Sequence, residues 1–462
     1  MTVWNSSRRR LEPESADRLR YELQDVPEPN LLRDIFPYDA VPKVVFDGAL
    51  EEMDPAPEFY ITDTTFRDGQ QARPPYTVQQ VVDLYQLLHR LGGPHGVIRQ
   101  AEFFLYSEVD REAVHRCLAL GYPFPEVTGW IRAVKSDFTL VKEMGLKETG
   151  ILTSCSDYHI FLKLKKTRRQ AYEDYLSVVK SALEAGIRLR CHLEDATRAD
   201  FYGFVVPFVS ELMRLREESG IPIKVRVCDT MGFGVPFPGA ALPRSVPKLI
   251  QGLRRECGVP AECLEWHGHN DFHKVLVNAA TAWLYGCMYA NGTLLGYGER
   301  TGNPPLEGLV MEYISLKGDA NGMDTSIITE IAHYFEHEIG YRIPPNYPFV
   351  GRDFNVTRAG IHADGLLKDE EIYNIFDTTK ILGRAPRVAV DKTSGAAGVS
   401  WWINTYFNLP SSRRVDKKAT AVKMITEWVD TQYRHERTTS ISDEEMLEQV
   451  RLHLPEVLKT AA

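Results

Sequence analysis

The chain has 462 residues, of which 44% are hydrophobic and 25% are charged, so we expect an ordinary soluble globular protein. This length is too great for one compact core but suits a large α/β barrel with appended segments. The formal net charge is −9 and the sequence contains no basic tract. These properties argue against nucleic acid as the main partner, although a local basic pocket for a small anion remains compatible with them.

Seven cysteines are scattered along the chain without a CxxC pair, which indicates reduced thiols in a cytoplasmic protein. The first residues, MTVWNSSRRR, are followed by no apolar segment of the secretory type. No apolar run reaches the roughly 18 residues that a membrane span requires. We therefore expect neither a secretory signal nor a membrane partner.

Residues 1–57 are charged and contain many prolines, with a helical patch near 15–25. We expect this segment to be an N-terminal arm that wraps a neighbouring surface rather than a domain.

From residue 58, short β-rich segments alternate with longer amphipathic segments. The strand-like segments are residues 59–66, 96–106, 124–132, 148–155, 187–195, 223–231, 262–270 and 289–296. Helix-period segments lie between most of them, such as 77–92, 168–186 and 273–286. Eight strands alternating with helices predict an α/β fold with a parallel (β/α)8 TIM barrel, at residues 58–305. A doubly wound open sheet is the alternative, but no glycine-rich phosphate turn follows the first strand.

The remaining residues, 306–462, predict a mostly helical C-terminal subdomain. Residues 304–345 have helical periodicity, whereas 344–367 are rich in glycine and proline and are expected to be irregular. The last 60 or so residues are charged and amphipathic, which again predicts helices.

Two histidines in the segment EWHGHND suggest a metal site. His267 and His269 are separated by one residue, so both imidazoles point to the same face of an extended strand. Alone, such a pair is more often structural than metal-binding, but Asp68 in DTTFRDGQQ would complete a His2Asp set with open positions. These ligands suit Mn²⁺, which we expect first, or Mg²⁺, Co²⁺ or Zn²⁺. Arg67 is either a surface ion-pair partner or, as we expect, a group that polarises a ketone oxygen.

Further polar residues follow the predicted strands, at the end of a barrel where active sites lie. They include Arg132 and His159. Arg190, His192 and Glu194 alternate along one strand and share a face. A charged trio inside a barrel is costly unless it meets a polar ligand, which favours a functional role.

Two glycine-containing segments are more ambiguous. The loop GYGERTGNPP, residues 296–305, is either a phosphate-binding loop or a tight turn. In RAGIHADG, His362 lies in a predicted loop beyond the barrel, where a histidine is as often a surface residue as a general acid or base.

The ordered motifs DTTFRDGQQ, SCSDYHIFLKL, HLEDATR, CDTMG, HGHND, GERTGN and GIHADG resemble those of the metal-dependent Claisen synthases of the 2-isopropylmalate and homocitrate synthase family. The resemblance covers residues 58 to about 400. Within that family the sequence is most similar to the Re-type citrate synthases.

This resemblance implies a role for each group of site residues. Asp68, His267 and His269 bind the metal, and Arg67 polarises the ketone of a 2-oxo acid. Gln71 and Thr230 contact the substrate, and Glu194 supports the site. His362 acts as catalytic base or acid, with Tyr373 assisting. The GERTGN loop would lie near acetyl-CoA; its residues are Gly298, Glu299, Arg300, Gly302 and Asn303.

The sequence also departs from the family pattern. Gln70 replaces an acidic residue common among relatives, so a role of that carboxylate in proton handling is lost. The chain also ends before a leucine-sensing domain would fit, so we expect no leucine feedback. By analogy with the family, we expect a homodimer.

The basic and hydrogen-bonding residues Arg132, His159, Arg190 and His192 suit a substrate with a second carboxylate. Oxaloacetate or 2-oxoglutarate is thus favoured over 2-oxoisovalerate, which would need an apolar pocket. The resemblance to Re-type citrate synthases favours oxaloacetate, giving citrate by acyl transfer from acetyl-CoA. Homocitrate synthase and 2-isopropylmalate synthase are the alternatives within the family. An HMG-CoA lyase-like or aldolase-type lyase is the alternative from another class, but such relatives generally lack the GIHADG segment.

Overall fold

The computed structural model describes residues 2–5, 10–13 and 22–458. The chain forms two compact units, Met1–Asp324 and Thr325–Ala462. The predicted subdomain boundary after residue 305 stays a prediction, although the compact units divide after Asp324. Among the described residues, no helix combines the length and the apolar character needed to cross a bilayer.

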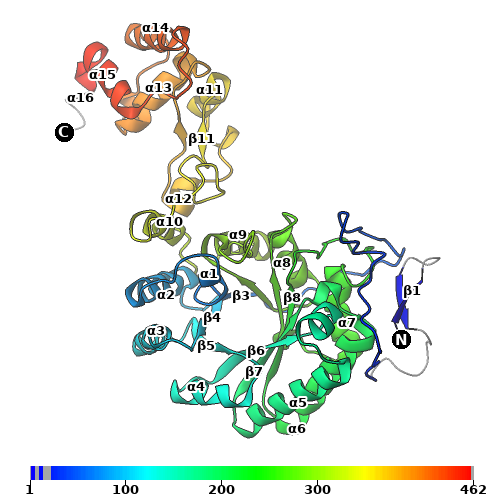
Figure 1. The fold of residues 1–462 in the computed structure, drawn as a ribbon. Coiled ribbons are helices and arrows are strands. Elements are labelled where there is room, and N and C mark those ends of the chain that lie inside the picture. The colour runs from blue at the N-terminus through cyan, green and yellow to red at the C-terminus, as the bar shows by residue number, and fades with distance from the viewer. Residues whose placement is uncertain (1, 6–9, 14–21, 459–462) are drawn as a thin grey trace. The chain divides into compact units, whose positions relative to one another are not determined.

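The first unit contains a closed barrel of parallel strands in the order β10-β3-β4-β5-β6-β7-β8-β9 (Figure 1). The strands are β3 (Tyr60–Asp63), β4 (Ile98–Phe104), β5 (Glu126–Ile131), β6 (Glu148–Ser154), β7 (Arg188–Glu194), β8 (Ile223–Asp229), β9 (Leu264–Gly268) and β10 (Tyr289–Gly292). Each lies inside one of the predicted strand segments. The predicted TIM barrel is confirmed, and the open doubly wound sheet is excluded because the sheet closes.

Helices surround the barrel on its outer face (Figure 1). They are α2 (Val78–Gly92), α3 (Glu108–Ala119), α4 (Phe138–Glu143), α5 (Arg168–Glu184), α6 (Val206–Ser219), α7 (Val246–Cys257), α8 (Val275–Leu284) and α9 (Leu306–Lys317). Helix α2 begins where the predicted pattern begins because Thr77 and Gln80 form a capping box. Its apolar stripe, including Leu84 and Leu88, is buried against the strands.

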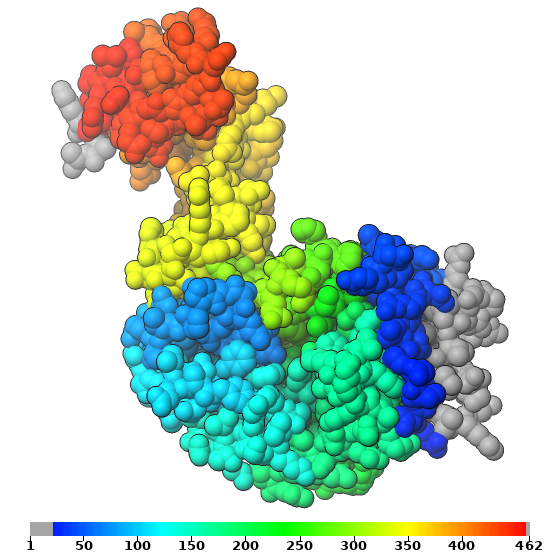
Figure 2. All heavy atoms as spheres, in the orientation of Figure 1, coloured from blue at the N-terminus to red at the C-terminus, as the bar shows by residue number. Residues whose placement is uncertain are grey.

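The N-terminal segment packs along the outside of the barrel. Strands β1 (Thr2–Asn5) and β2 (Arg10–Pro13) form an antiparallel pair. The predicted helical patch near 15–25 lies mostly outside the described residues, and its described part, 22–25, is not helical. Residues 22–57 lie on the barrel surface, where Asp47 pairs with Lys248 at 2.5 Å and Glu51 with Arg255 at 2.7 Å. Figure 2 shows this segment in dark blue over the barrel.

The second unit is mostly helical, as predicted. It contains α10 (Ile327–His337), β11 (Val356–Thr357), α11 (Gly360–Lys368), α12 (Thr378–Leu382), β12 (Arg387–Val388), α13 (Gly395–Tyr406), α14 (Thr420–Arg434), α15 (Asp443–His453) and α16 (Pro455–Leu458). One prediction is wrong, because RAGIHADG is not a loop: α11 begins at Gly360 and carries His362. A Cβ atom at Gly360 would lie 2.6 Å from the Ser394 carbonyl oxygen, so the start of α11 requires glycine.

Candidate active site

The side chains of Asp68, His267 and His269 converge at the carboxyl end of the barrel strands. Asp68 begins the short helix α1 (Asp68–Gln71) after β3, His267 lies on β9, and His269 directly follows it. Asp68 Oδ2 lies 3.6 Å from Nε2 of His267 and 3.6 Å from Nε2 of His269. That oxygen is buried without a hydrogen-bond partner, which is costly unless a cation satisfies it. One carboxylate oxygen and two imidazole nitrogens form a donor set that fits a divalent metal.

The protonation states of these groups also suit metal binding. Burial lowers the pKa of His267 to about 4 and lowers the pKa of His269, so both imidazoles are neutral at pH 7. Burial alone would raise the pKa of Asp68, but it is held below its ordinary value by the positive charge of Arg67 and, in acid where they become protonated, by the two imidazoles. Metal ligands must be deprotonated, and all three are.

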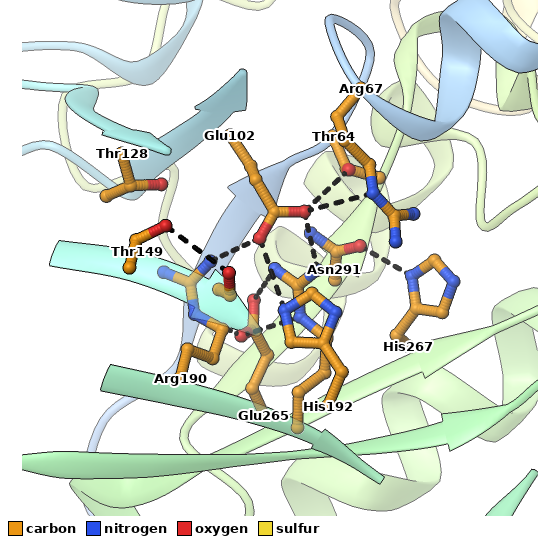
Figure 3. A network of polar contacts seen from close by, with 12 residues as sticks. Thr64, Arg67, Glu102, Thr128, Thr149, Arg190, His192, Glu265, His267 and Asn291 are labelled. Carbon is orange, nitrogen blue, oxygen red and sulfur yellow. Dashed lines mark hydrogen bonds and ion pairs between the residues drawn. The ribbon is translucent and has the colours of Figure 1, made fainter. Parts of the chain in front are cut away.

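A second layer of side chains orients His267. Asn291 Oδ1 on β10 lies 2.7 Å from His267 Nδ1 (Figure 3). The amide of Asn291 in turn donates to Thr62, at 2.9 Å to its hydroxyl and 3.2 Å to its carbonyl oxygen. Sequence reasoning missed Asn291, because nothing in YANGTLLG distinguishes it from a turn residue.

Arg67 is held in place by three neighbours. Its Nη1 donates to Asp68 Oδ1 at 2.9 Å, and its Nε lies 3.8 Å from Glu102 Oε2. Its guanidinium carbon lies 4.8 Å from the centre of the Trp130 ring. The side chain of the neighbouring Gln70 donates to the Phe66 carbonyl oxygen and accepts from the Tyr76 amide. Gln70, which replaces an acidic residue common among relatives, therefore forms hydrogen bonds with the local backbone.

A pocket of about 290 Å³ opens beside the three candidate ligands. Its lining contains the predicted residues Arg67, Asp68, Gln71, His192, Glu194, Thr230, His267, His269 and Glu299. Sequence reasoning missed four other lining residues, Trp130, Leu152, Lys163 and Cys228. Lys163 lies within the motif SCSDYHIFLKL, and its position in that motif could have identified it as a pocket residue.

Glu194, at the end of β7, is the centre of a charged group. His159 Nδ1 lies 3.1 Å from Glu194 Oε2, and Lys163 Nζ lies 3.0 Å from Glu194 Oε1. Burial alone would raise the pKa of Glu194, but hydrogen bonds from His159 and Ser154 and the charge of Lys163 bring it to about 2. Glu194 is therefore an ionised acceptor. His159 contacts it but is absent from the described pocket lining.

Arg190 lies deeper in the barrel than the sequence suggested. It is 0% exposed, and its Nη1 lies 3.0 Å from Glu102 Oε1 (Figure 3). Its Nη2 lies 2.7 Å from Glu148 Oε1. Its Nε lies 2.8 Å from Glu265. The argument that the charged trio on β7 needs a polar ligand is thus wrong for Arg190, because carboxylates on β4, β6 and β9 already balance its charge.

The two other predicted substrate contacts differ in position. Burial lowers the pKa of His192 to about 3, and its Nε2 lies 3.3 Å from Glu102 Oε1, so a neutral imidazole lines the pocket. The side chain of Arg132 is 64% exposed and pairs with Asp137 at 2.9 Å. It is not among the described residues that line the pocket.

The predicted glycine-rich loop connects to the candidate metal site through Asn303. Asn303 Nδ2 donates to the Gly268 carbonyl oxygen at 3.0 Å, between the two histidines. A Cβ atom at Gly298 would lie 2.0 Å from Asn303 Oδ1, so this close approach requires glycine. Arg300 Nε donates to Asp271 at 2.8 Å, and the Gly302 amide donates to the Glu299 carbonyl oxygen. The predicted contact of this loop with acetyl-CoA stays a prediction.

The sequence model of a family described as HMGL-like matches residues 58–334, more than half of the chain. The chain belongs to the HMGL-like family. This result confirms the resemblance inferred from the ordered motifs.

Two curated relatives of this HMGL-like chain are named citrate (Re)-synthase. The protein from Syntrophus aciditrophicus is 60% identical over 457 residues, which cover 99% of this chain and 73% of the relative. The protein from Clostridium kluyveri is 56% identical over 439 residues, which cover 95% of this chain and 97% of the relative. The solved structure of a Bacillus subtilis HMG-CoA lyase has a TM-score of 0.51 at 19% identity, covering 63% of this chain and 97% of that chain. At that identity the likeness shows a shared fold alone.

His362 and Tyr373 lie beyond the residues that match the HMGL-like model, in the second unit. Their ring centroids are 4.3 Å apart with a 38° interplanar angle. A Cβ atom at Gly365 would lie 2.5 Å from the Tyr373 ring, so glycine allows that ring to pack on α11. The two predicted catalytic residues are therefore neighbours, and their roles stay predictions.

Proposed function

We propose that this chain is a metal-dependent citrate (Re)-synthase that condenses acetyl-CoA with oxaloacetate. The observation that carries the proposal is the 60% and 56% identity, across nearly the whole chain, to two proteins of that name. The convergence of Asp68, His267 and His269 beside a pocket supports it independently, because the reaction needs a polarised ketone.

In the proposed reaction, one C–H bond of the acetyl methyl group breaks and a C–C bond forms to the ketone carbon of oxaloacetate. Hydrolysis of the resulting thioester consumes one water and releases coenzyme A and citrate. A divalent metal held by Asp68, His267 and His269 supplies a Lewis acid for the 2-oxo acid. Mn²⁺ is the metal we propose.

The chain's own residues perform the other steps. Arg67, held by Asp68, Glu102 and Trp130, directs its guanidinium toward the ketone oxygen, where negative charge develops as the C–C bond forms. We propose His362, assisted by Tyr373, as the group that removes the methyl proton. Glu194 is already ionised, so its proposed role is to hold His159 and Lys163 at the rim.

The proposal also covers the assembly and its location. We propose a homodimer, which light scattering after size-exclusion chromatography tests. A cytoplasmic location is consistent with seven buried cysteines that are all free thiols.

The experiment that tests the function measures thiol release from acetyl-CoA by the metal-loaded protein, with oxaloacetate, 2-oxoglutarate or 2-oxoisovalerate as the second substrate. Oxaloacetate is expected to give the highest kcat/KM, with citrate as the product. A preference for 2-oxoglutarate or 2-oxoisovalerate would indicate a homocitrate or 2-isopropylmalate synthase. Cleavage of HMG-CoA without condensation would indicate a lyase.

A further inference from the structure

The described lining of the pocket contains two basic side chains, Arg67 and Lys163. Among the described lining residues, these are the only arginine and lysine side chains. Arg67 donates to Asp68 beside the candidate metal ligands. Lys163 is therefore the one described positive charge in the lining that lies away from the metal ligands.

The barrel topology places Lys163 across the pocket from these ligands. Lys163 ends the π-helical segment Tyr158–Lys163 that follows β6, whereas Asp68 follows β3 and His267 lies on β9. In the closed strand order, β6 is three strands from β3 in one direction and three strands from β9 in the other. A substrate with its ketone at the metal ligands can extend across the pocket. Its other end would then lie near the carboxyl end of β6.

The ammonium group of Lys163 is also accessible from the pocket. Its ammonium group has three N–H bonds, and Glu194 takes two of them, at 3.0 and 3.1 Å. His159 Nδ1, 3.3 Å away, is the third neighbour of the ammonium group. The side chain of Lys163 is still 50% exposed and lines the pocket, so a carboxylate in the pocket can reach its ammonium group.

We propose that Lys163 binds the second carboxylate of the 2-oxo dicarboxylic acid and thereby selects oxaloacetate over 2-oxo monocarboxylic acids. The inference rests on the proposed function for the identity of the reaction, and it assigns the substrate contact that Arg132 and Arg190 were expected to make. Those residues are already paired, with Asp137 and with buried glutamates.

The test compares binding of two acids to the metal-loaded protein by calorimetry without acetyl-CoA. 2-Oxobutyrate has a methyl group where oxaloacetate has its second carboxylate, so the pair isolates that group. In Lys163→Met, the Kd for oxaloacetate is expected to rise about 10- to 100-fold, the effect of losing a charge-assisted hydrogen bond. The Kd for 2-oxobutyrate is expected to stay within about twofold. Lys163→Arg, which keeps the charge, is expected to retain a preference for oxaloacetate.

Lys166→Met is the matched control, because Lys166 pairs with Asp174 at 2.6 Å and is not in the described pocket lining. It is expected to leave both Kd values unchanged. Equal weakening of both acids in Lys163→Met would mean that Lys163 only holds Glu194, and would overturn the inference. So would a wild-type protein that binds 2-oxobutyrate as tightly as oxaloacetate. If Lys163→Met weakens oxaloacetate binding alone but the wild-type protein forms no citrate, the proposed function fails and the assignment of the carboxylate contact to Lys163 stands.

Discussion

Asn291 determines which nitrogen of His267 is available to a metal. The Asn291 amide group donates to Thr62 at 2.9 and 3.2 Å, so its oxygen is the atom that faces His267 Nδ1 at 2.7 Å. Nδ1 therefore carries the hydrogen, and the lone pair is on Nε2, the nitrogen 3.6 Å from Asp68. Strand β10, which contributes none of the three candidate ligands, thus orients the His267 ligand on β9.

Replacing Asn291 with leucine should weaken metal binding about 10- to 100-fold, because His267 loses the acceptor that fixes its tautomer and ring orientation. Competition with a metal-sensitive dye measures the Kd. Asn278→Ala is the control, since Asn278 is also buried but donates to the Gly234 carbonyl oxygen. Unchanged metal affinity in Asn291→Leu would show that this hydrogen bond has no role in metal binding.

Arg190 should matter for stability. Replacing it with methionine removes one of the buried cations that balance Glu102, Glu148 and Glu265. These carboxylates then keep Arg226 and Lys224 as their nearest cationic partners among the described groups. The uncompensated buried charge should cost about 3–5 kcal/mol in the free energy of unfolding. Arg132→Met should cost less than about 1 kcal/mol, because its pair is exposed. Urea unfolding measures both changes. Equal stability of the two variants would contradict the assignment of Arg190 to the barrel interior.

The charged group around Glu194 should appear in the pH dependence of stability. The pKa of Glu194 is about 2 in the folded chain, against an ordinary value of 4.5. Its stabilising effect is therefore complete above about pH 5 and is lost as the pH falls toward 2. Between pH 7 and pH 4, the wild-type protein should lose about 1 kcal/mol more unfolding free energy than Glu194→Gln. Asp174→Asn removes an exposed carboxylate and should follow the wild type; an identical loss in Glu194→Gln would refute the ion-pair account.

The barrel could be predicted from the sequence because eight strand-like segments follow one another from residue 58, with helix-period segments between most of them. The metal cluster was predictable for a similar reason, since two histidines at alternating positions must share a face of their strand. The partners of Arg190 were not predictable, because Glu102, Glu148 and Glu265 are far from it in sequence and only barrel closure brings them together. The role of Gly360 in starting α11 depends on contact with Ser394, which the local sequence does not reveal.

His362 provides a prediction about rate. His362→Ala should lower kcat about 100- to 10,000-fold, the usual contribution of general acid–base catalysis, while the Kd for oxaloacetate and for metal stays unchanged. His333→Ala, a matched change of another exposed histidine in the same unit, should retain full activity. Stopped-flow thiol release and calorimetry separate the two effects. A His362→Ala variant with wild-type kcat would exclude His362 as the base.

The most direct test of the account is a metal titration of the metal-depleted protein, with citrate formation from acetyl-CoA and oxaloacetate measured at each point. Citrate formation should be absent without metal and should rise linearly until one divalent ion is bound per chain. His267→Ala should neither bind the ion nor form citrate at the same metal concentrations. Undiminished citrate formation by the metal-depleted protein, or by His267→Ala, would contradict the central claim.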